Sequence, residues 1–188
     1  MERLRLHPKL RRGVIARPLV IAGMAADGDP FRGFLYAGLM LTSAGPQVIE
    51  FNVRLGDPEA QVILPLIDEP LAPLLAAAAQ GGLARSACRL LDRKLVGVVL
   101  ASRGYPESAE SGRGIDGIPR AEASGASVFH AGTAIDGGRL VTAGGRVLTV
   151  VGQGDSYEQA ITRAYAGVDQ ISFDGMQYRR DIGKKALK

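Results

Sequence analysis

The chain has no tryptophan, two histidines and a single cysteine among its 188 residues. One cysteine, Cys88, excludes a disulfide within the chain and argues against a cysteine-rich zinc site. Because no histidine lies near Cys88 in the sequence, we expect a small buried apolar residue beside Leu90 and Leu91 rather than a catalytic thiol. Such sparing use of cysteine is typical of the reducing cytoplasm, the compartment that we predict.

The sequence also lacks long apolar runs, and it has few aromatic residues among its basic ones. No stretch reaches the roughly 20 apolar residues that cross a bilayer, and residues 1–12 alternate charge with leucine, unlike a signal peptide. The net charge of +4 comes mainly from the two ends of the chain, and five Phe and five Tyr give little stacking surface among those cations. We therefore predict no membrane and no nucleic-acid partner, and anionic small substrates instead.

The composition that remains is that of a soluble globular protein. Apolar residues make up 46% and charged residues 22%, while 25 glycines and 10 prolines predict many turns rather than long helices. The length allows one ordinary domain or two small ones. Because short strands and glycine-rich turns dominate after about residue 92, we predict two domains, residues 1–92 and residues 93–188.

Apolar periodicity and turn residues predict the class α+β for the whole chain. In the first domain they indicate helices and a pair of adjacent antiparallel strands: helices over 14–26, 58–67 and 70–80, and strands over 31–42 and 46–53. In the second they indicate a β-rich unit with one closing helix: a strand over 94–102, short strands and turns over 104–154, and a helix over 155–169.

Glu50, Asn52 and Arg54 alternate along one predicted strand, and side chains two residues apart share a face. A carboxylate and an amide oxygen are ligands that Mg²⁺ accepts, and a guanidinium holds phosphate through its planar fork. This face therefore predicts a site for a metal-bound nucleotide phosphate. Two structural alternatives stay open: a hydrogen-bonded pair of Glu50 and Asn52 that organises the turn, and a surface ion pair of Arg54 with Asp57 or Glu59.

The run from Arg54 to Gln61 resembles the signature of phosphoribosylamine glycine ligase, also called glycinamide ribonucleotide synthetase, an ATP-grasp enzyme of purine biosynthesis. Leu55 stands where the family usually has phenylalanine, an apolar exchange that affects packing more than chemistry. Further segments resemble the same family in the same order: residues 30–40, 99–106, 128–133, 144–148 and 173–183. The resemblance extends from about residue 14 to the end of the chain.

The resemblance implies a fold: the last part of the ATP-grasp large lobe, an antiparallel sheet with helices, followed by the small β-rich C-terminal domain. The family's Rossmann-like domain and its nucleotide-clamping lysines have no counterpart in the sequence. We therefore expect a C-terminal fragment with uncovered apolar strand faces, inactive alone, and a second chain that supplies the missing N-terminal half. A non-catalytic binding module or an inert fragment is the alternative.

The resemblance also implies a reaction, the ATP-dependent ligation of glycine to 5-phosphoribosylamine through glycyl phosphate. Glu50 and Asn52 occupy the positions of the family's ligands for Mg²⁺ or Mn²⁺, which agrees with the argument from the strand face. Arg54 would then hold a phosphate of ATP or the acyl phosphate. A different ATP-grasp ligase, a relative of the carboxylases, is disfavoured by the Gly-Asp-Pro-Glu continuation after Leu55.

On the substrate side, the resemblance implies roles for four residues. Gly56 would allow close approach of the backbone, and Asp57 would either contact the substrate in catalysis or cap the following helix. Arg146 would meet the sugar phosphate of 5-phosphoribosylamine, with His130 lining the same side of the cleft. For Arg146 and His130, a purely structural role is the alternative.

Several points stay open from the sequence. They are the status of Met1 as a genuine start, the oligomeric state, the activity and ATP binding of the chain by itself, and the nature of the loop over residues 103–117. That loop is rich in glycine and proline, and is either a mobile surface loop or a flap over a ligand.

Overall fold

The computed structural model describes residues 20–83 and 87–187, which form parts of two compact units. Unit 1 comprises Met1–Gly56 and Pro70–Ala87, and unit 2 comprises Asp57–Glu69 and Cys88–Lys188. Residues 57–69 therefore pack with the second unit, although they lie within the first of the two domains predicted from composition. Among the described residues, no helix has the length and apolar character needed to cross a bilayer.

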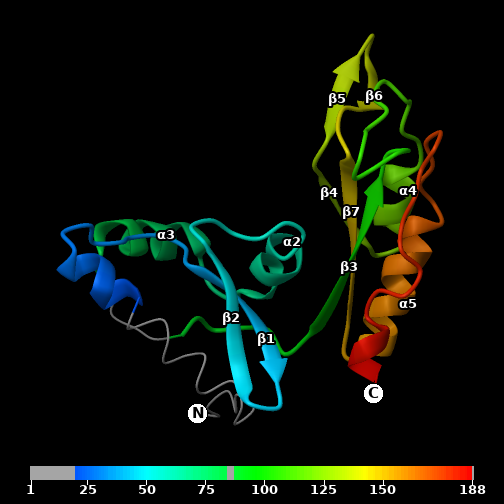
Figure 1. Ribbon diagram of the computed structural model, residues 1–188. Helices are drawn as coiled ribbons and strands as arrows, with labels where there is room; N and C mark the ends of the chain where they lie inside the picture. Colours follow the sequence, from blue (N-terminus) through cyan, green and yellow to red (C-terminus); the bar gives the residue numbers. More distant parts are fainter. Residues whose placement is uncertain (1–19, 84–86, 188) are drawn as a thin grey trace. The chain divides into compact units, whose positions relative to one another are not determined.

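Unit 1 contains a helical segment over residues 20–26, a two-stranded sheet and one further helix (Figure 1). The named elements are β1 (Tyr36–Thr42), β2 (Gly45–Asn52) and α3 (Leu71–Gln80). The strands pair antiparallel, as predicted. α3 follows Pro70 and ends at Gly81, whose φ of 74° is a left-handed conformation that glycine adopts without strain.

The predicted boundaries in unit 1 needed correction. β1 begins only at Tyr36, five residues later than predicted, and Gly33 with a φ of 135° lies in the irregular segment before it. β2 ends at Asn52, because residues 53 and 54 form a bend. Residues 14–19 of the first predicted helix lie outside the described residues.

The register of β1 and β2 separates two faces. Ala37 lies opposite Phe51 and Leu39 opposite Val48, which makes one face apolar, while Glu50 lies opposite Gly38 on the other face. A shift in register after Gly38 leaves one extra residue in β2. Large apolar side chains of this hairpin region are exposed in the described structure, namely Met40, Leu41, Val48, Ile49, Phe51 and Val53.

Unit 2 is built on a three-stranded antiparallel sheet in the order β3-β7-β4, with α5 packed against it (Figure 1). Its strands are β3 (Lys94–Ala101), β4 (Ser127–His130), β7 (Arg146–Gly154) and the separate hairpin of β5 (Thr133–Asp136) and β6 (Arg139–Thr142). Its helices are α2 (Ala60–Ile63), α4 (Ile118–Ala123), α5 (Tyr157–Val168) and the 3₁₀ turns η1 (Leu64–Leu66) and η2 (Lys184–Leu187).

The core of unit 2 lies between the sheet and α5. Fully buried side chains of the strands, Val98, Leu100, Leu148 and Val150, share one cluster with those of α5, Ala160, Ala164 and Val168. The apolar stripe that predicted the closing helix is therefore confirmed. Ser156 caps the helix, since its side chain accepts a hydrogen bond from the Gln159 N–H at 3.3 Å.

The helix predicted over residues 58–67 is shorter than expected. α2 has four residues and passes into η1, where Pro65 has no N–H to continue an α-helix. Its N-cap is Glu59, without a capping side chain, so the prediction of Asp57 as the cap is wrong. The Asp57 carboxylate instead accepts hydrogen bonds from Gln61 and Arg146.

Cys88 is exposed, so the prediction of a buried cysteine is wrong. The segment around it passes along the outside of unit 2, where Leu90 forms an isolated antiparallel bridge with Ile67. Leu90 and Leu91 are themselves 45% and 38% exposed. Apolar neighbours in the sequence therefore did not indicate a buried position here.

Candidate functional site

Two groups of predicted site residues occur in the structure, one in each unit. In unit 1, Glu50 and Asn52 lie on the same face near the end of β2, and the Asn52 amide nitrogen donates to a Glu50 carboxylate oxygen at 3.0 Å. This contact brings together the two predicted metal ligands. It is also the hydrogen-bonded pair that the sequence left open as an alternative, and the two are compatible because the Asn52 amide oxygen is not used in it.

The chemistry of this pair fits a magnesium-type ion. Among the described residues, no group of three or more His, Cys, Asp or Glu side chains could enclose a metal. Glu50 and Asn52 nevertheless provide two oxygen donors, and Mg²⁺ commonly takes only one or two protein ligands, with waters and phosphates completing its shell. The metal assignment stays a prediction that the donor set supports.

Gly38 is a part of this site that the sequence analysis missed. It lies opposite Glu50 in the hairpin, and a Cβ at this position would lie 3.0 Å from Cγ of Glu50. The sequence did contain a signal for this role, because a glycine inside a predicted strand often marks the close approach of another group. Gly38 therefore leaves room for the Glu50 side chain.

We expect Gly38→Ala to displace the Glu50 carboxylate and to weaken Mg²⁺-dependent nucleotide binding about fivefold, close to 1 kcal/mol. Titration calorimetry with MgADP measures this. Gly82→Ala is the matched control, because a Cβ there approaches no atom closer than 4.0 Å among the described residues. Equal affinities of the Gly38 and Gly82 variants would contradict the role of Gly38.

Arg54 follows β2 instead of lying in it. Its Nη1 donates to the carbonyl oxygen of Leu55 at 3.1 Å. The alternation that joined Arg54 to Glu50 and Asn52 therefore stops at Asn52, where the strand ends. No other partner of the Arg54 guanidinium occurs within the described part of the chain, so its contact with phosphate stays a prediction.

In unit 2, Arg146 joins Asp57 to Tyr105. Its Nη1 donates to the backbone oxygen of Asp57 at 2.5 Å and to the Asp57 carboxylate at 3.1 Å, and its Nε donates to the Tyr105 hydroxyl at 2.7 Å. The hydrogen bond to Tyr105 and then the one to Asp57 raise the pKa of the Arg146 guanidinium. Arg146 therefore stays a fixed cation at any physiological pH.

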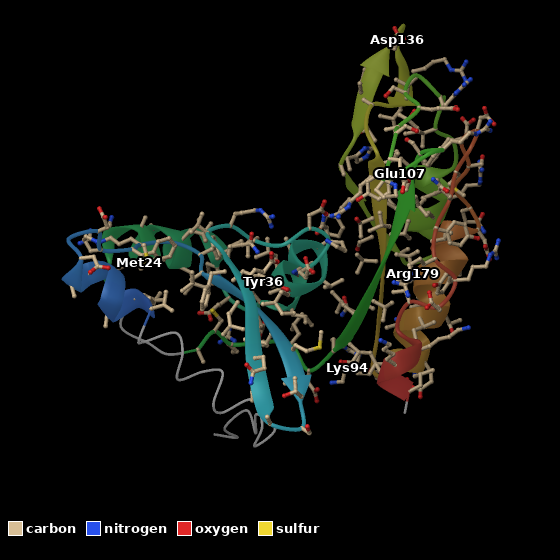
Figure 2. All side chains as sticks on the ribbon, viewed as in Figure 1. Met24, Tyr36, Lys94, Glu107, Asp136 and Arg179 are labelled. Carbon is tan, nitrogen blue, oxygen red and sulfur yellow. The ribbon has the colours of Figure 1, made fainter. Side chains whose placement is uncertain are left out.

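Arg146 lines a cavity of about 500 Å³ in unit 2. Gly97, Val99 and Ala101 give it an apolar wall from β3, and Arg179 is a second cation in its lining. Figure 2 labels Arg179 on the C-terminal segment beside β3 and α5. The cavity thus combines an apolar wall with two guanidinium groups.

Arg179 is held by its own acidic partner. Its Nε and Nη2 donate to the two Asp181 oxygens at 2.9 and 2.7 Å. These bonds raise the pKa of Arg179 and lower the pKa of Asp181. The remaining nitrogen of the Arg179 guanidinium, Nη1, has no partner among the described residues, as is also the case for Nη2 of Arg146. Its N–H groups can therefore donate to an anion.

Two other predicted residues lie apart from this arrangement. His130 is exposed at the end of β4, with its Nδ1 3.1 Å from the Thr133 hydroxyl, and it is not among the described residues that line the cavity of Arg146. Gly56 is the last residue of the first part of unit 1 and is buried. Their substrate contacts stay predictions.

Comparisons with known families place two matches along the chain. The family described as "Phosphoribosylglycinamide synthetase, ATP-grasp (A) domain" matches residues 8–60. The family described as "Phosphoribosylglycinamide synthetase, C domain" matches residues 95–185. The two matches follow the order in which the sequence analysis found its resemblances.

Curated relatives carry the same name. The phosphoribosylamine–glycine ligase of Mesorhizobium japonicum is 48% identical over 88% of this chain and 39% of its own length. The enzyme of that name from Chlorobaculum tepidum is 46% identical over 96% of this chain and 43% of its own length. The chain therefore spans about two fifths of the length of these relatives.

Solved structures agree in fold. The crystal structure of phosphoribosylamine–glycine ligase from Thermotoga maritima matches with a TM-score of 0.72 and 40% identity, over 85% of this chain and 39% of that one. The N5-carboxyaminoimidazole ribonucleotide synthetase of the same organism matches with a TM-score of 0.57 at 18% identity, over 90% of this chain and 44% of that one. The second likeness concerns the fold alone.

Proposed function

Because the chain belongs to the phosphoribosylamine–glycine ligase family, we propose that it serves the ATP-dependent ligation of glycine to 5-phosphoribosylamine in purine biosynthesis. The observation that carries the proposal is the ordered match of two domains of one ligase to residues 8–60 and 95–185. The product would be glycinamide ribonucleotide. The cytoplasm is the proposed compartment, in keeping with the single cysteine.

The reaction divides into two transfers. A carboxylate oxygen of glycine attacks the γ-phosphorus of ATP, the bond from that phosphorus to the bridging oxygen breaks, and ADP leaves. The amine of 5-phosphoribosylamine then attacks the acyl carbon of glycyl phosphate, inorganic phosphate leaves, and the nitrogen loses a proton. Phosphoryl transfer needs positioning and charge stabilisation above all, so the protein's side chains need not react covalently.

On the nucleotide side, Glu50 and Asn52 would hold the divalent ion, Mg²⁺ or Mn²⁺, as the exposed oxygen donors of β2. When bound, such an ion neutralises the negative charge of the transferring phosphate. Arg54 would hold a phosphate oxygen of ATP or of glycyl phosphate through Nε and Nη2, which have no partner in the described part of the chain. Gly56 would let the backbone approach the substrate closely.

On the phosphoribosyl side, the cavity of unit 2 supplies the proposed site. Nη2 of Arg146 and Nη1 of Arg179, which have no partner among the described residues, would bind the sugar phosphate, and the apolar wall of β3 would pack against the ribose. Asp57, held by Arg146, would contact the substrate near the reacting amine. His130 is proposed only for an outer contact, since it does not line this cavity.

The nucleotide side is tested by titration of the purified chain with MgADP. We expect binding, and at least a tenfold loss of affinity when Glu50→Ala and Asn52→Ala are combined, because both oxygen donors are then removed. Gln47→Ala is the control, being an exposed polar residue of the same strand. Binding that is unchanged in the double variant, or independent of Mg²⁺, would contradict the assignment of these ligands.

Turnover is tested with glycine, 5-phosphoribosylamine and MgATP. Since the chain spans about two fifths of its relatives' length, we expect ADP release only when a second chain supplies the remaining part. The control is that second chain alone. Sustained ADP release by the present chain by itself would show that no partner is needed, and a complete lack of MgADP binding would favour an inert fragment or a module that binds something else.

A further inference from the structure

Tyr105 lies against the backbone where β7 begins. A Cβ at Gly145 would lie 2.3 Å from a carbon of the Tyr105 ring, so only glycine allows this close packing. The ring lies beside the next residue too, with the guanidinium carbon of Arg146 5.8 Å from the ring centre. This packing brings the Tyr105 hydroxyl to Nε of Arg146 at 2.7 Å.

The guanidinium of Arg146 is thereby held at two of its three nitrogens. Nε is bound to Tyr105, and Nη1 is bound twice to Asp57. Because the guanidinium is planar, these contacts define the direction of the third nitrogen, Nη2, which has no partner in the described part of the chain. One side chain can thus hold Asp57 and still present a donor to an anion in the cavity.

The loop that carries Tyr105 is fastened to unit 2 at several points. Tyr105 donates its N–H to the Ser102 oxygen at 3.3 Å, and the buried Ser102 hydroxyl donates to the Gly144 oxygen at 2.7 Å. Two arginines and two acids join the far side of the loop to the C-terminal segment: Arg103, Glu110, Arg113 and Asp174. The sequence left open whether this loop is a flap over a ligand. These contacts indicate instead that the loop is a fixed support for Tyr105.

We propose that Tyr105 is a positioning residue for the phosphoribosyl substrate. By holding Nε of Arg146, it directs Nη2 of that guanidinium toward the phosphate and keeps Nη1 on Asp57. The proposal rests on the phosphoribosyl function of the cavity proposed above, and it adds a residue that was not among the predicted site residues. Without the hydroxyl, the planar guanidinium is held only at Nη1, by Asp57, so it can pivot about that contact and Nη2 is less firmly directed.

The probe for this proposal is ribose 5-phosphate, a stable analogue of the substrate, titrated into the purified chain. We expect Tyr105→Phe to weaken binding about tenfold, in the range of one hydrogen bond to a charged group, while the melting temperature changes little because the ring remains. Tyr157→Phe is the matched control. Tyr157 is not among the residues that line the cavity of Arg146. It lines a smaller, neighbouring cavity that shares Pro58, Gly97 and Ile182 with the first, and its hydroxyl has no partner among the described residues.

Tyr105→Phe is also tested in a protein that carries Arg146→Lys. This comparison distinguishes a positioning role of Tyr105 from a general effect on the structure. Lysine has a single ammonium in place of the planar guanidinium, so in the Arg146→Lys variant the Tyr105 hydroxyl has no second nitrogen to direct toward the phosphate. We therefore expect Tyr105→Phe to cause no further loss of ribose 5-phosphate affinity in that background. A loss that adds in full to that of Arg146→Lys would overturn the proposal and indicate a role unrelated to the guanidinium.

The remaining outcomes distinguish this proposal from the one on which it rests. If the intact chain binds ribose 5-phosphate and Tyr105→Phe binds it equally well, the positioning role is wrong and the cavity assignment survives. If the intact chain binds MgADP but no ribose 5-phosphate, the phosphoribosyl assignment of the cavity is wrong, and the role of Tyr105 is overturned with it.

Discussion

Replacing Gly152 with alanine is expected to destabilise unit 2 by roughly 3 kcal/mol, the upper part of the range for overpacking a core. Gly152 lies in β7 under α5, and a Cβ there would lie 2.2 Å from the Ala160 carbonyl oxygen and 2.3 Å from the Ala164 amide nitrogen. Both are backbone atoms of the helix. They cannot move aside as a side chain can, so α5 would have to lift from the sheet.

Urea denaturation followed by circular dichroism measures this loss of stability, and the melting temperature should fall by about 10 °C or more. Gly82→Ala is the control for the same chemical change, since its Cβ meets no described atom closer than 4.0 Å. A Gly152→Ala protein as stable as the Gly82→Ala protein would contradict the close packing of α5 on β7.

Leu148→Ala is expected to cost about 3 kcal/mol, in the middle of the range for buried leucines. The Leu148 side chain has 0% exposure and belongs to the cluster between the sheet and α5. Its removal loses apolar burial and leaves a cavity that the surrounding strands cannot fill completely. The free energy of unfolding in urea measures the effect.

Ile135→Ala is the matched control for this second substitution. It removes an apolar side chain of similar size, but Ile135 is 69% exposed in the hairpin of β5 and β6. We expect a change within about 0.5 kcal/mol, as for most surface positions. Similar losses at Leu148 and Ile135 would show that burial in this core does not determine the stability of unit 2.

The sequence predicted well those elements whose signals are local. The pairing of β1 with β2, the helix ended by Gly81 and the closing helix capped at Ser156 all follow from apolar periodicity and from turn or cap residues within a few positions. The contact of Glu50 with Asn52 follows in the same way, because alternation along one strand is enough to bring the two side chains together.

Errors arose where a distant partner decides the outcome. Capping of the following helix was one of the two roles predicted for Asp57, but its carboxylate accepts a hydrogen bond from Arg146, 89 residues away. Cys88 has apolar neighbours in the sequence, yet its segment pairs on the outside of unit 2 through Leu90 and Ile67. Periodicity reports which face of an element is apolar, and it does not report which other element covers that face.

By itself, the sequence determined the α+β class, the family and the pair of oxygen donors on β2, since each depends on residues close together in the chain or on ordered motifs. Only the tertiary structure decided that Arg146 binds Asp57 and Tyr105 beside a cavity, and that residues 57–69 pack with unit 2. The physical reason is that a guanidinium, a carboxylate and a phenol can pair in many ways. The packing of the ring on Gly145 selects one of them.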